Sequence, residues 1–314
     1  MADIVCKATR ESFGMALCEM AETNKDIVVL DADLAAATKT SIFGSAFPER
    51  FKDCGIAEGN MMGVAAGLAA AGKIPVAASF AMFSTGRAYE IIRNSIAYPG
   101  LNVKIAGSHA GISTGEDGAT HQCIEDVALM RTLPGMTVLC PADHYEMMEA
   151  TKAALSITGP VYIRLGRLAI DSFNDPDTYK FELGKGITLH EGNDVAVIAT
   201  GLVVNEARKA VNALEAEGIN ARLINIHTIK PIDRDIIIKA AKECGQIITV
   251  EEHNIIGGLA DAVCEVTSSE CPVKVTRIGV NDEFGYSGPA WELLELFGLT
   301  ETGIAKVIRE TVKK

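Results

Sequence analysis

Short runs of aliphatic and β-branched residues alternate along the chain with longer segments that have the apolar spacing of helices. Each run is bounded by glycine or polar residues, as the strands of a buried sheet are. Strands separated by segments of helical length pair in parallel, so the pattern predicts an α/β fold with a doubly wound sheet. The predicted strands in the first half of the chain are residues 27–30, 74–77, 102–105, 136–139 and 161–163.

This alternation stops in the middle of the chain and then resumes. The stretch Asp171–Asp177 is rich in turn-forming residues and has neither a helical nor a strand period. We therefore predict two α/β domains, residues 1–167 and a smaller one at residues 186–314, joined by a linker at residues 168–185. The predicted strands of the second domain are residues 195–198, 221–226, 247–250 and 273–276.

Length and composition agree with two packed domains. The 314 residues are about twice the length of a common domain, and 48% of them are hydrophobic against 22% charged. The net charge of -12 and the lack of any Lys- or Arg-rich cluster argue against a nucleic-acid or anionic-membrane surface. No apolar stretch is long enough to cross a bilayer and the N-terminus does not resemble a targeting signal, so we expect a cytoplasmic protein. The eight cysteines form no Cys-x-x-Cys pair and are expected to be free, buried thiols, with no metal site in this chain.

Polar residues follow the predicted strands of the first domain at their carboxyl ends, where α/β sheets bind ligands. In chain order they are Asp31–Asp33, Ser79–Phe83, Ser108–His121, and Arg164 with Arg167. Either His109 or His121 alone would be equally well explained as a surface or hydrogen-bonded loop residue. Two histidines, several carboxylates and arginines on one rim are harder to explain by packing, because each polar group needs a partner once water is displaced. The rim is therefore the candidate site, although neither domain contains a nucleotide-binding glycine motif.

Glu58 is a candidate acid–base group at the start of a predicted helix. The residues that follow it, up to Ala71, are mostly small, so we expect this helix to pack very closely against a neighbour such as a second chain. Acidic residues are common in the first turn of a helix because of the helix dipole, and most have no further role. A carboxyl group enclosed in a tight contact differs from these, because it can exchange a proton with a heteroaromatic nitrogen.

Three segments of the first domain together resemble the pyrimidine-binding domain of transketolases. They are Gly55–Met61, Ser79–Phe83 and Gly115–Gln122, in this order. In the second domain, Glu251–Leu259 and Phe284–Pro289 look like the carboxy-terminal domain shared by transketolase, deoxyxylulose-phosphate synthase and 2-oxo acid dehydrogenase beta subunits. The resemblance covers nearly the whole chain and implies an enzyme that depends on thiamine diphosphate.

One element of that family is missing from the sequence. Transketolases hold Mg²⁺ and the diphosphate with a Gly-Asp-Gly followed by an Asn, in a domain that precedes these two, and no Gly-Asp-Gly occurs here. The resemblance therefore implies the carboxy-terminal subunit of a split transketolase, active only with an amino-terminal subunit that supplies the metal and diphosphate site. The expected assembly is a heterotetramer with two copies of each subunit, which binds sugar phosphates and neither nucleic acid nor membrane.

The resemblance also implies roles for residues around the cofactor. Glu58 matches the glutamate that hydrogen-bonds the pyrimidine nitrogen and favours the tautomer that activates the cofactor. Phe83 matches the aromatic residue that stacks on the pyrimidine, with Phe80 beside it, and Asp33 matches a carboxylate near the thiazolium ring. Gly59 departs from the family pattern, because split transketolases tend to carry a bulkier polar residue after the glutamate.

Around the substrate, His121 and Asp117 match residues that contact the reacting oxygen and the neighbouring hydroxyl, while Arg10, His109 and Arg164 match cationic residues that hold the distal phosphate. The implied reaction transfers a two-carbon ketol unit from a ketose phosphate to an aldose phosphate, as in the pentose phosphate pathway. The alternatives are a related thiamine-diphosphate enzyme, such as a deoxyxylulose-phosphate synthase or another ketol transferase, and a non-catalytic scaffold subunit. The second domain is expected to serve assembly.

Overall fold

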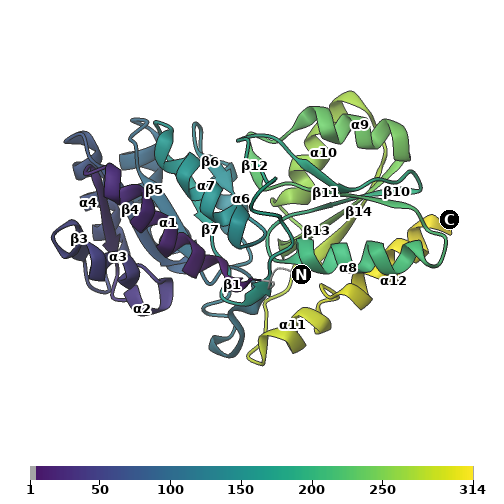
Figure 1. The fold of residues 1–314 in the computed structure, drawn as a ribbon, viewed down its shortest axis with the longest axis horizontal. Coiled ribbons are helices and arrows are strands. Elements are labelled where there is room, and N and C mark those ends of the chain that lie inside the picture. The colour runs from purple at the N-terminus through teal and green to yellow at the C-terminus, as the bar shows by residue number, and fades with distance from the viewer. Residues whose placement is uncertain (1–4, 314) are drawn as a thin grey trace.

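The computed structural model describes residues 5–313 and consists of two α/β lobes that lie side by side (Figure 1). The sheet of the first lobe has seven strands in the order β12-β6-β7-β5-β4-β2-β3, and within it only β12 pairs antiparallel to its neighbour. The predicted doubly wound α/β fold is confirmed in this lobe. Its strands are β2 (Ile27–Asp31), β3 (Phe51–Asp53), β4 (Ile74–Phe80), β5 (Lys104–Ser108), β6 (Thr137–Leu139), β7 (Val161–Arg164) and β12 (Thr228–Lys230).

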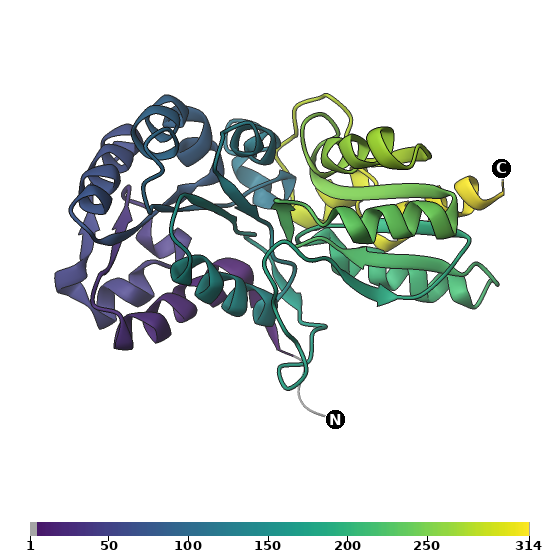
Figure 2. The same cartoon turned by 90° about the horizontal axis from the view of Figure 1, so that it is seen from above.

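Helices cover both faces of this sheet (Figure 2). This explains why its central strands β4 and β5 are buried at nearly every position, since neither face meets water. One helical layer includes α1 (Thr9–Thr23) and α7 (His144–Ser156), which pack on each other. The remaining helices are α2 (Ala35–Thr38), α3 (Ser41–Ala46), α4 (Glu58–Ala70), α5 (Tyr89–Ile91) and α6 (Asp126–Arg131), with the 3-10 turns η1 (Pro48–Arg50) and η4 (Ile112–Asp117) and the π-helical turns η2 (Met82–Arg87) and η3 (Ile92–Ala97).

The second lobe repeats the architecture with five strands in the order β14-β13-β10-β11-β9, of which β9 is antiparallel. None of the helices within residues 5–313 is both long and apolar enough to cross a membrane. The strands of this lobe are β9 (Ile187–His190), β10 (Val195–Ala199), β11 (Ala221–Asn225), β13 (Gln246–Asn254) and β14 (Lys274–Val280). Its helices are α8 (Val203–Glu215), α9 (Arg234–Cys244), α10 (Leu259–Glu270), α11 (Ala290–Leu296) and α12 (Glu301–Val312).

All nine strands predicted from the sequence are present, and five short ones were missed. One missed strand lies inside the predicted linker at residues 168–185: β8 (Ala169–Asp171) pairs antiparallel with β1 (Cys6–Ala8). Another, β12, follows the predicted domain boundary in sequence and yet completes the sheet of the first lobe by pairing with β6. A strand from the second half of the sequence therefore belongs to the sheet of the first lobe, which joins the lobes in addition to the covalent connection.

Buried hydrogen bonds also connect the two lobes. The guanidinium of Arg164, at the end of β7, donates from Nε and Nη2 to the carboxylate of Asp126 at 2.8 and 3.2 Å. The same Nη2 also donates to the main-chain carbonyl of Glu252 in the second lobe at 2.8 Å. Asp126 has no exposed surface, and Tyr162 donates its hydroxyl to it at 2.7 Å. One buried apolar cluster runs through both lobes beside these contacts.

Candidate functional site

The residues predicted to line the site are brought to one rim by the parallel register of the first sheet. Asp31 of β2 lies beside Ala78 of β4, and Phe80 of β4 lies beside Ser108 of β5. The carboxyl ends of these three strands therefore meet, as the sequence predicted. Both Asp33 and His109 leave the rim with positive φ angles, 61° and 55°, so the chain turns sharply at each strand end.

Glu58 is the first residue of α4, as predicted, and its carboxylate is buried with 2% of its surface exposed. Arg87, in η2, donates to both oxygens of this carboxylate at 3.0 and 2.8 Å. The Arg87 guanidinium also lies 4.7 Å from the ring centroid of Phe83. Arg87 thus joins the predicted carboxylate to the predicted aromatic residue, a link that the sequence analysis did not find.

Four aromatic side chains form a cluster next to this ion pair. The ring of Phe80 stacks on His109 with centroids 3.9 Å apart and lies nearly parallel to Phe83 at 5.9 Å. The imidazole of His121 meets Phe83 edge-on at 5.3 Å. Phe80 is almost fully buried whereas Phe83 is partly exposed. The cluster therefore offers a flat aromatic surface that a ring-shaped ligand could contact.

His109 is enclosed between hydrogen-bonding partners. Its Nδ1 lies 2.9 Å from the Ser108 hydroxyl and its Nε2 lies 3.3 Å from Nη1 of Arg10. Burial and the positive charges of Arg10 and Arg167 lower the pKa of His109 to about 3. The ring is therefore neutral at physiological pH and takes part in the site as a hydrogen-bonding group.

Two arginines and a lysine line a cavity of ≈ 540 Å³ next to His109. Its lining includes Arg10, Lys39 and Arg167 from the first lobe and Trp291 from α11 of the second. Burial and the neighbouring Arg167 lower the pKa of Arg10. The Nε of Arg10 is buried and has no partner within the described chain. The lining also includes the carboxylates of Glu11 and Glu116, the latter paired with Arg167 at 2.7 Å. Three cations against two carboxylates leave a small excess of positive charge, which suits an anionic ligand group.

The geometry does not favour the predicted role of Arg164 as a phosphate ligand. This residue is 7% exposed, and its Nε and Nη2 are engaged by Asp126 and the Glu252 carbonyl in the contact between the lobes. Arg167, which lies three residues later, is placed differently. It lines the cavity and is partly exposed, with Nη1 donating to the Thr114 carbonyl and the Glu116 carboxylate at 2.6 and 2.7 Å.

Two further predicted carboxylates lie on the exposed side of the rim. Asp33 and Asp117 are both exposed, and the main-chain N–H of Asp33 donates to the Asp53 carboxylate at 3.1 Å. Asp31, by contrast, is fully buried and accepts hydrogen bonds from Thr38 and Thr40 at 2.7 and 2.8 Å. Asp31 therefore supports the turn after β2, while Asp33 and Asp117 are available to ligands.

The helix that begins at Glu58 has one face without cover. An added Cβ at Gly63 or Gly67 would meet no atom within 4 Å, and at Gly59 only the edge of Ile91. Val64, on the same helix, and Ile56, just before it, are exposed by 40% and 76%. The predicted close packing of this helix on a second chain therefore has an open surface available for it.

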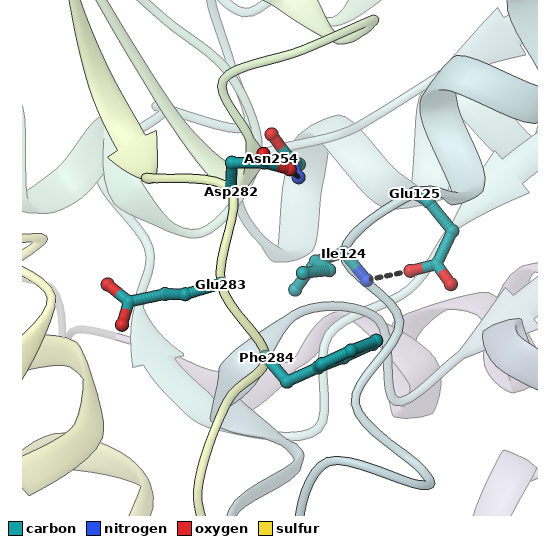
Figure 3. A pocket seen from close by; sticks show the side chains of 6 residues that line it. All are labelled: Ile124, Glu125, Asn254, Asp282, Glu283 and Phe284. Carbon is teal, nitrogen blue, oxygen red and sulfur yellow. Dashed lines mark hydrogen bonds between the residues drawn. The ribbon is translucent and has the colours of Figure 1, made fainter.

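A cavity of ≈ 230 Å³ lies between the lobes beyond the loop that ends in His121 (Figure 3). Ile124 and Glu125 line one side, and the segment Asp282–Phe284 of the second lobe lines the other. Three carboxylates surround it, and Phe284 is 77% exposed. The second lobe thus reaches the rim of the site.

Within residues 5–313, no three His, Cys, Asp or Glu side chains are grouped so that they could hold a metal ion. All eight cysteines are free, but only Cys123, Cys140 and Cys244 are buried, which limits the predicted burial to these three. Arg87, Lys39 and Trp291 were not among the site residues predicted from the sequence. For Arg87 a signal existed, because it follows Phe83 by four residues, one helical turn.

Two family models match the chain. The model described as "Transketolase, pyrimidine binding domain" matches residues 6–171, and the one described as "Transketolase, C-terminal domain" matches residues 184–304. Together they account for both lobes, in the order that the sequence predicted.

Similar proteins of nearly equal length are known. A putative transketolase C-terminal section from Methanocaldococcus jannaschii is 48% identical, and the alignment covers 99% of this chain and 98% of that protein. A 6-deoxy-6-sulfo-D-fructose transketolase subunit from Clostridium sp. strain MSTE9 is 44% identical, with 97% and 94% covered. A solved structure described as "Split gene transketolase, inactive beta4 tetramer" is 52% identical and superposes with a TM-score of 0.91, covering 98% of this chain and 99% of that one.

Proposed function

The chain belongs to the transketolase family, and on that premise we propose that it is the carboxy-terminal subunit of a split transketolase. In this role it transfers a two-carbon ketol unit between sugar phosphates together with an amino-terminal subunit. The observation that carries the proposal is the group formed by Glu58, Arg87 and Phe83, because it places a buried carboxylate and an aromatic face at the same end of α4.

These residues fit the aminopyrimidine of thiamine diphosphate. Phe83 presents a partly exposed aromatic ring, and the Glu58 carboxylate is enclosed at the edge of the open face of α4. When bound, the cofactor supplies the electron sink for breaking a carbon–carbon bond next to a carbonyl. Glu58 would hold a proton at the ring nitrogen, and Phe80 and Phe83 would fix the plane of the ring. The contact of Asp33 with the cationic ring is proposed on its exposed position at the rim.

The substrate would lie between the aromatic cluster and the cationic cavity. Arg10 and Arg167 would hold the distal anionic group, and the neutral imidazole of His109 would give or accept a hydrogen bond beside them. His121 and Asp117 would contact the hydroxyl groups near the reacting carbon. Because binding energy from the distal anion orients the reacting end, its loss should weaken binding and turnover together.

An amino-terminal subunit would cover the open face of α4 and complete the cofactor site. The uncovered glycines of α4 support this, as does the length match to relatives described as a section or a subunit. We place Mg²⁺ and the diphosphate contacts on that partner, in a heterotetramer with two copies of each chain. A cytoplasmic location stays a prediction from the sequence.

The cavity does not identify the preferred sugar, because its arginines recognise the charge of the distal group. A phosphate and a sulfonate would both pair with Arg10 and Arg167, and one relative is described as acting on a sulfo-sugar. A deoxyxylulose-phosphate synthase would use pyruvate as donor, and a non-catalytic scaffold subunit would catalyse no turnover.

Substrate choice tests the proposal. The chain is mixed with its amino-terminal partner, thiamine diphosphate and Mg²⁺, and is assayed with xylulose 5-phosphate plus ribose 5-phosphate and, separately, with pyruvate plus glyceraldehyde 3-phosphate. We expect ketol transfer in the first assay only. Turnover of pyruvate would favour the synthase. A complex that is inactive with both pairs, and also with a sulfo-sugar as donor, would favour the scaffold.

A further inference from the structure

Loop 109–121, which carries Asp117 and ends at His121, is held on one side by the second lobe. The carboxylate of Glu252, in β13, reaches across the contact between the lobes, and its Oε1 accepts the main-chain N–H of Ser113 at 2.6 Å. Glu252 is 3% exposed, so this hydrogen bond is shielded from water. The bond attaches the start of η4 to the other lobe.

A glycine makes this approach possible. Gly111 has a φ of 83°, and a Cβ added there would lie 2.4 Å from both Oε1 and Cδ of Glu252. The carboxylate therefore occupies the space that any other residue at position 111 would need. The backbone conformation and the contact with Glu252 both require glycine.

Other contacts from the second lobe reach the same loop further on. Gln122 donates its side-chain amide to the carbonyls of Ile112 and Gly115 within the first lobe and to the carbonyl of Tyr286 in the second. A Cβ at Gly118 would collide with the side chain of Ser287. The second lobe thus contacts the loop at its start and near Asp117.

We propose that Glu252 is a positioning residue that fixes loop 109–121, and through it Asp117 and His121, from the second lobe. The proposal rests on the proposed function for its effect on ketol transfer. The contact itself is a property of the chain alone.

The neighbouring residue provides a matched control. Glu251 is equally buried, but successive side chains of a strand point to opposite faces. Its carboxylate accepts the N–H groups of Leu259 and Ala260 at 2.7 and 2.8 Å, both at the start of α10 in its own lobe. Burial raises the pKa of both carboxyl groups. The two residues therefore differ in their partners: Glu252 binds the loop of the first lobe, whereas Glu251 binds the start of α10.

Hydrogen exchange in the full chain separates the two roles without substrate. Glu252→Asp retains the charge but shortens the side chain, so the contact with Ser113 is lost. Glu252→Gln keeps both the length and an acceptor oxygen. We expect amide exchange in residues 109–121 to rise about 10-fold or more in Glu252→Asp and to stay near the wild-type rate in Glu252→Gln. Amide exchange in residues 259–270 should be unchanged in both variants.

Glu251→Asp should give the converse result, with faster exchange in residues 259–270 and none of the change in the loop. In the complex with the partner, Glu252→Asp should lower kcat/KM for the ketose phosphate by about 10-fold, and Glu252→Gln should retain most of it. Unchanged loop exchange in Glu252→Asp, or equal changes in both segments for the two Asp variants, would overturn the proposal. If the wild-type complex transfers no ketol unit, the proposed function fails, but the exchange comparison still decides the positioning role.

Discussion

The two sides of the candidate site differ in what surrounds them. On the cofactor side, α4 presents Gly63 and Gly67 without any covering atom, and Glu58 relies on the half-exposed Arg87 as its partner. On the substrate side, loop 109–121 is contacted by Glu252 and Ser287 of the second lobe. Loop 109–121 has its contacts within the chain, whereas α4 has an open face. Under the proposed function, the chain would position substrate groups with its own residues, and a second surface would be needed to enclose the cofactor.

The largest expected effect concerns the carboxylate on the open side. In the complex with the partner, Glu58→Gln should lower turnover about 10²- to 10⁴-fold, because the amide cannot exchange a proton with the ring nitrogen. Assembly, followed by analytical ultracentrifugation, should be unchanged. Glu49→Gln, at an exposed carboxylate, is the control. Unchanged turnover in Glu58→Gln would favour the scaffold alternative.

The next effect separates the two arginines that follow β7. Arg164→Ala leaves the carboxylate of Asp126 buried and unpaired, so the free energy of unfolding in urea should fall by about 3–5 kcal/mol. Arg167→Ala should change stability by less than about 0.5 kcal/mol, because its side chain is partly exposed, yet raise KM for the phosphorylated donor about 10-fold or more. A stable Arg164→Ala variant with a raised KM would restore the original prediction for Arg164.

A pair of glycines compares the two sides directly. Gly111→Ala should lower the free energy of unfolding by about 2–4 kcal/mol, because its φ is positive and Glu252 fills the space. Gly63→Ala should raise it by about 0.5–1 kcal/mol in the isolated chain, since alanine favours the helix and nothing is displaced. Gly63→Leu should leave the isolated chain folded and prevent binding of the partner. Normal partner binding by Gly63→Leu would show that this face is not the interface.

The smallest effect concerns His109, which should not titrate in the folded protein between pH 8 and 5. Because the pKa of His109 is lowered to about 3, its ring signals in NMR spectra should not shift between pH 8 and 5. The unfolded chain binds a proton at this ring below its ordinary value of 6.5 while the folded chain does not. The contribution of His109 to stability is therefore present above pH 6.5 and is lost as the pH falls toward 3. A midpoint near 6.5 in the folded protein would contradict this burial.

The sequence predicted those features that depend on local pattern. The central strands were recognisable as short aliphatic and β-branched runs, which burial on both faces favours, and Glu58 was placed at a helix start. The edge strands β3 and β12 were missed, since each is only three residues long and its sequence, Phe-Lys-Asp or Thr-Ile-Lys, contains two polar residues. The pairing of β12 with β6 also joins segments about 90 residues apart in sequence, which no local pattern reveals.

The site residues follow the same division. Phe80, Phe83, His109 and His121 could be grouped because they follow strands or lie in one loop. The choice between Arg164 and Arg167 could not be made, because it depends on Asp126 lying inside the contact between the lobes. Glu252 lies in the segment Glu251–Leu259 that carries the family resemblance, but its contact with Ser113 could not be predicted, because the two residues are 139 positions apart.

Titration with the amino-terminal partner tests most directly the claim that this chain is half of a catalytic unit. Ketol transfer from xylulose 5-phosphate to ribose 5-phosphate is measured at a fixed concentration of this chain while the partner is added. The account predicts no turnover without partner and a plateau at equimolar partner. Full turnover by this chain alone, unaffected by added partner, would contradict it.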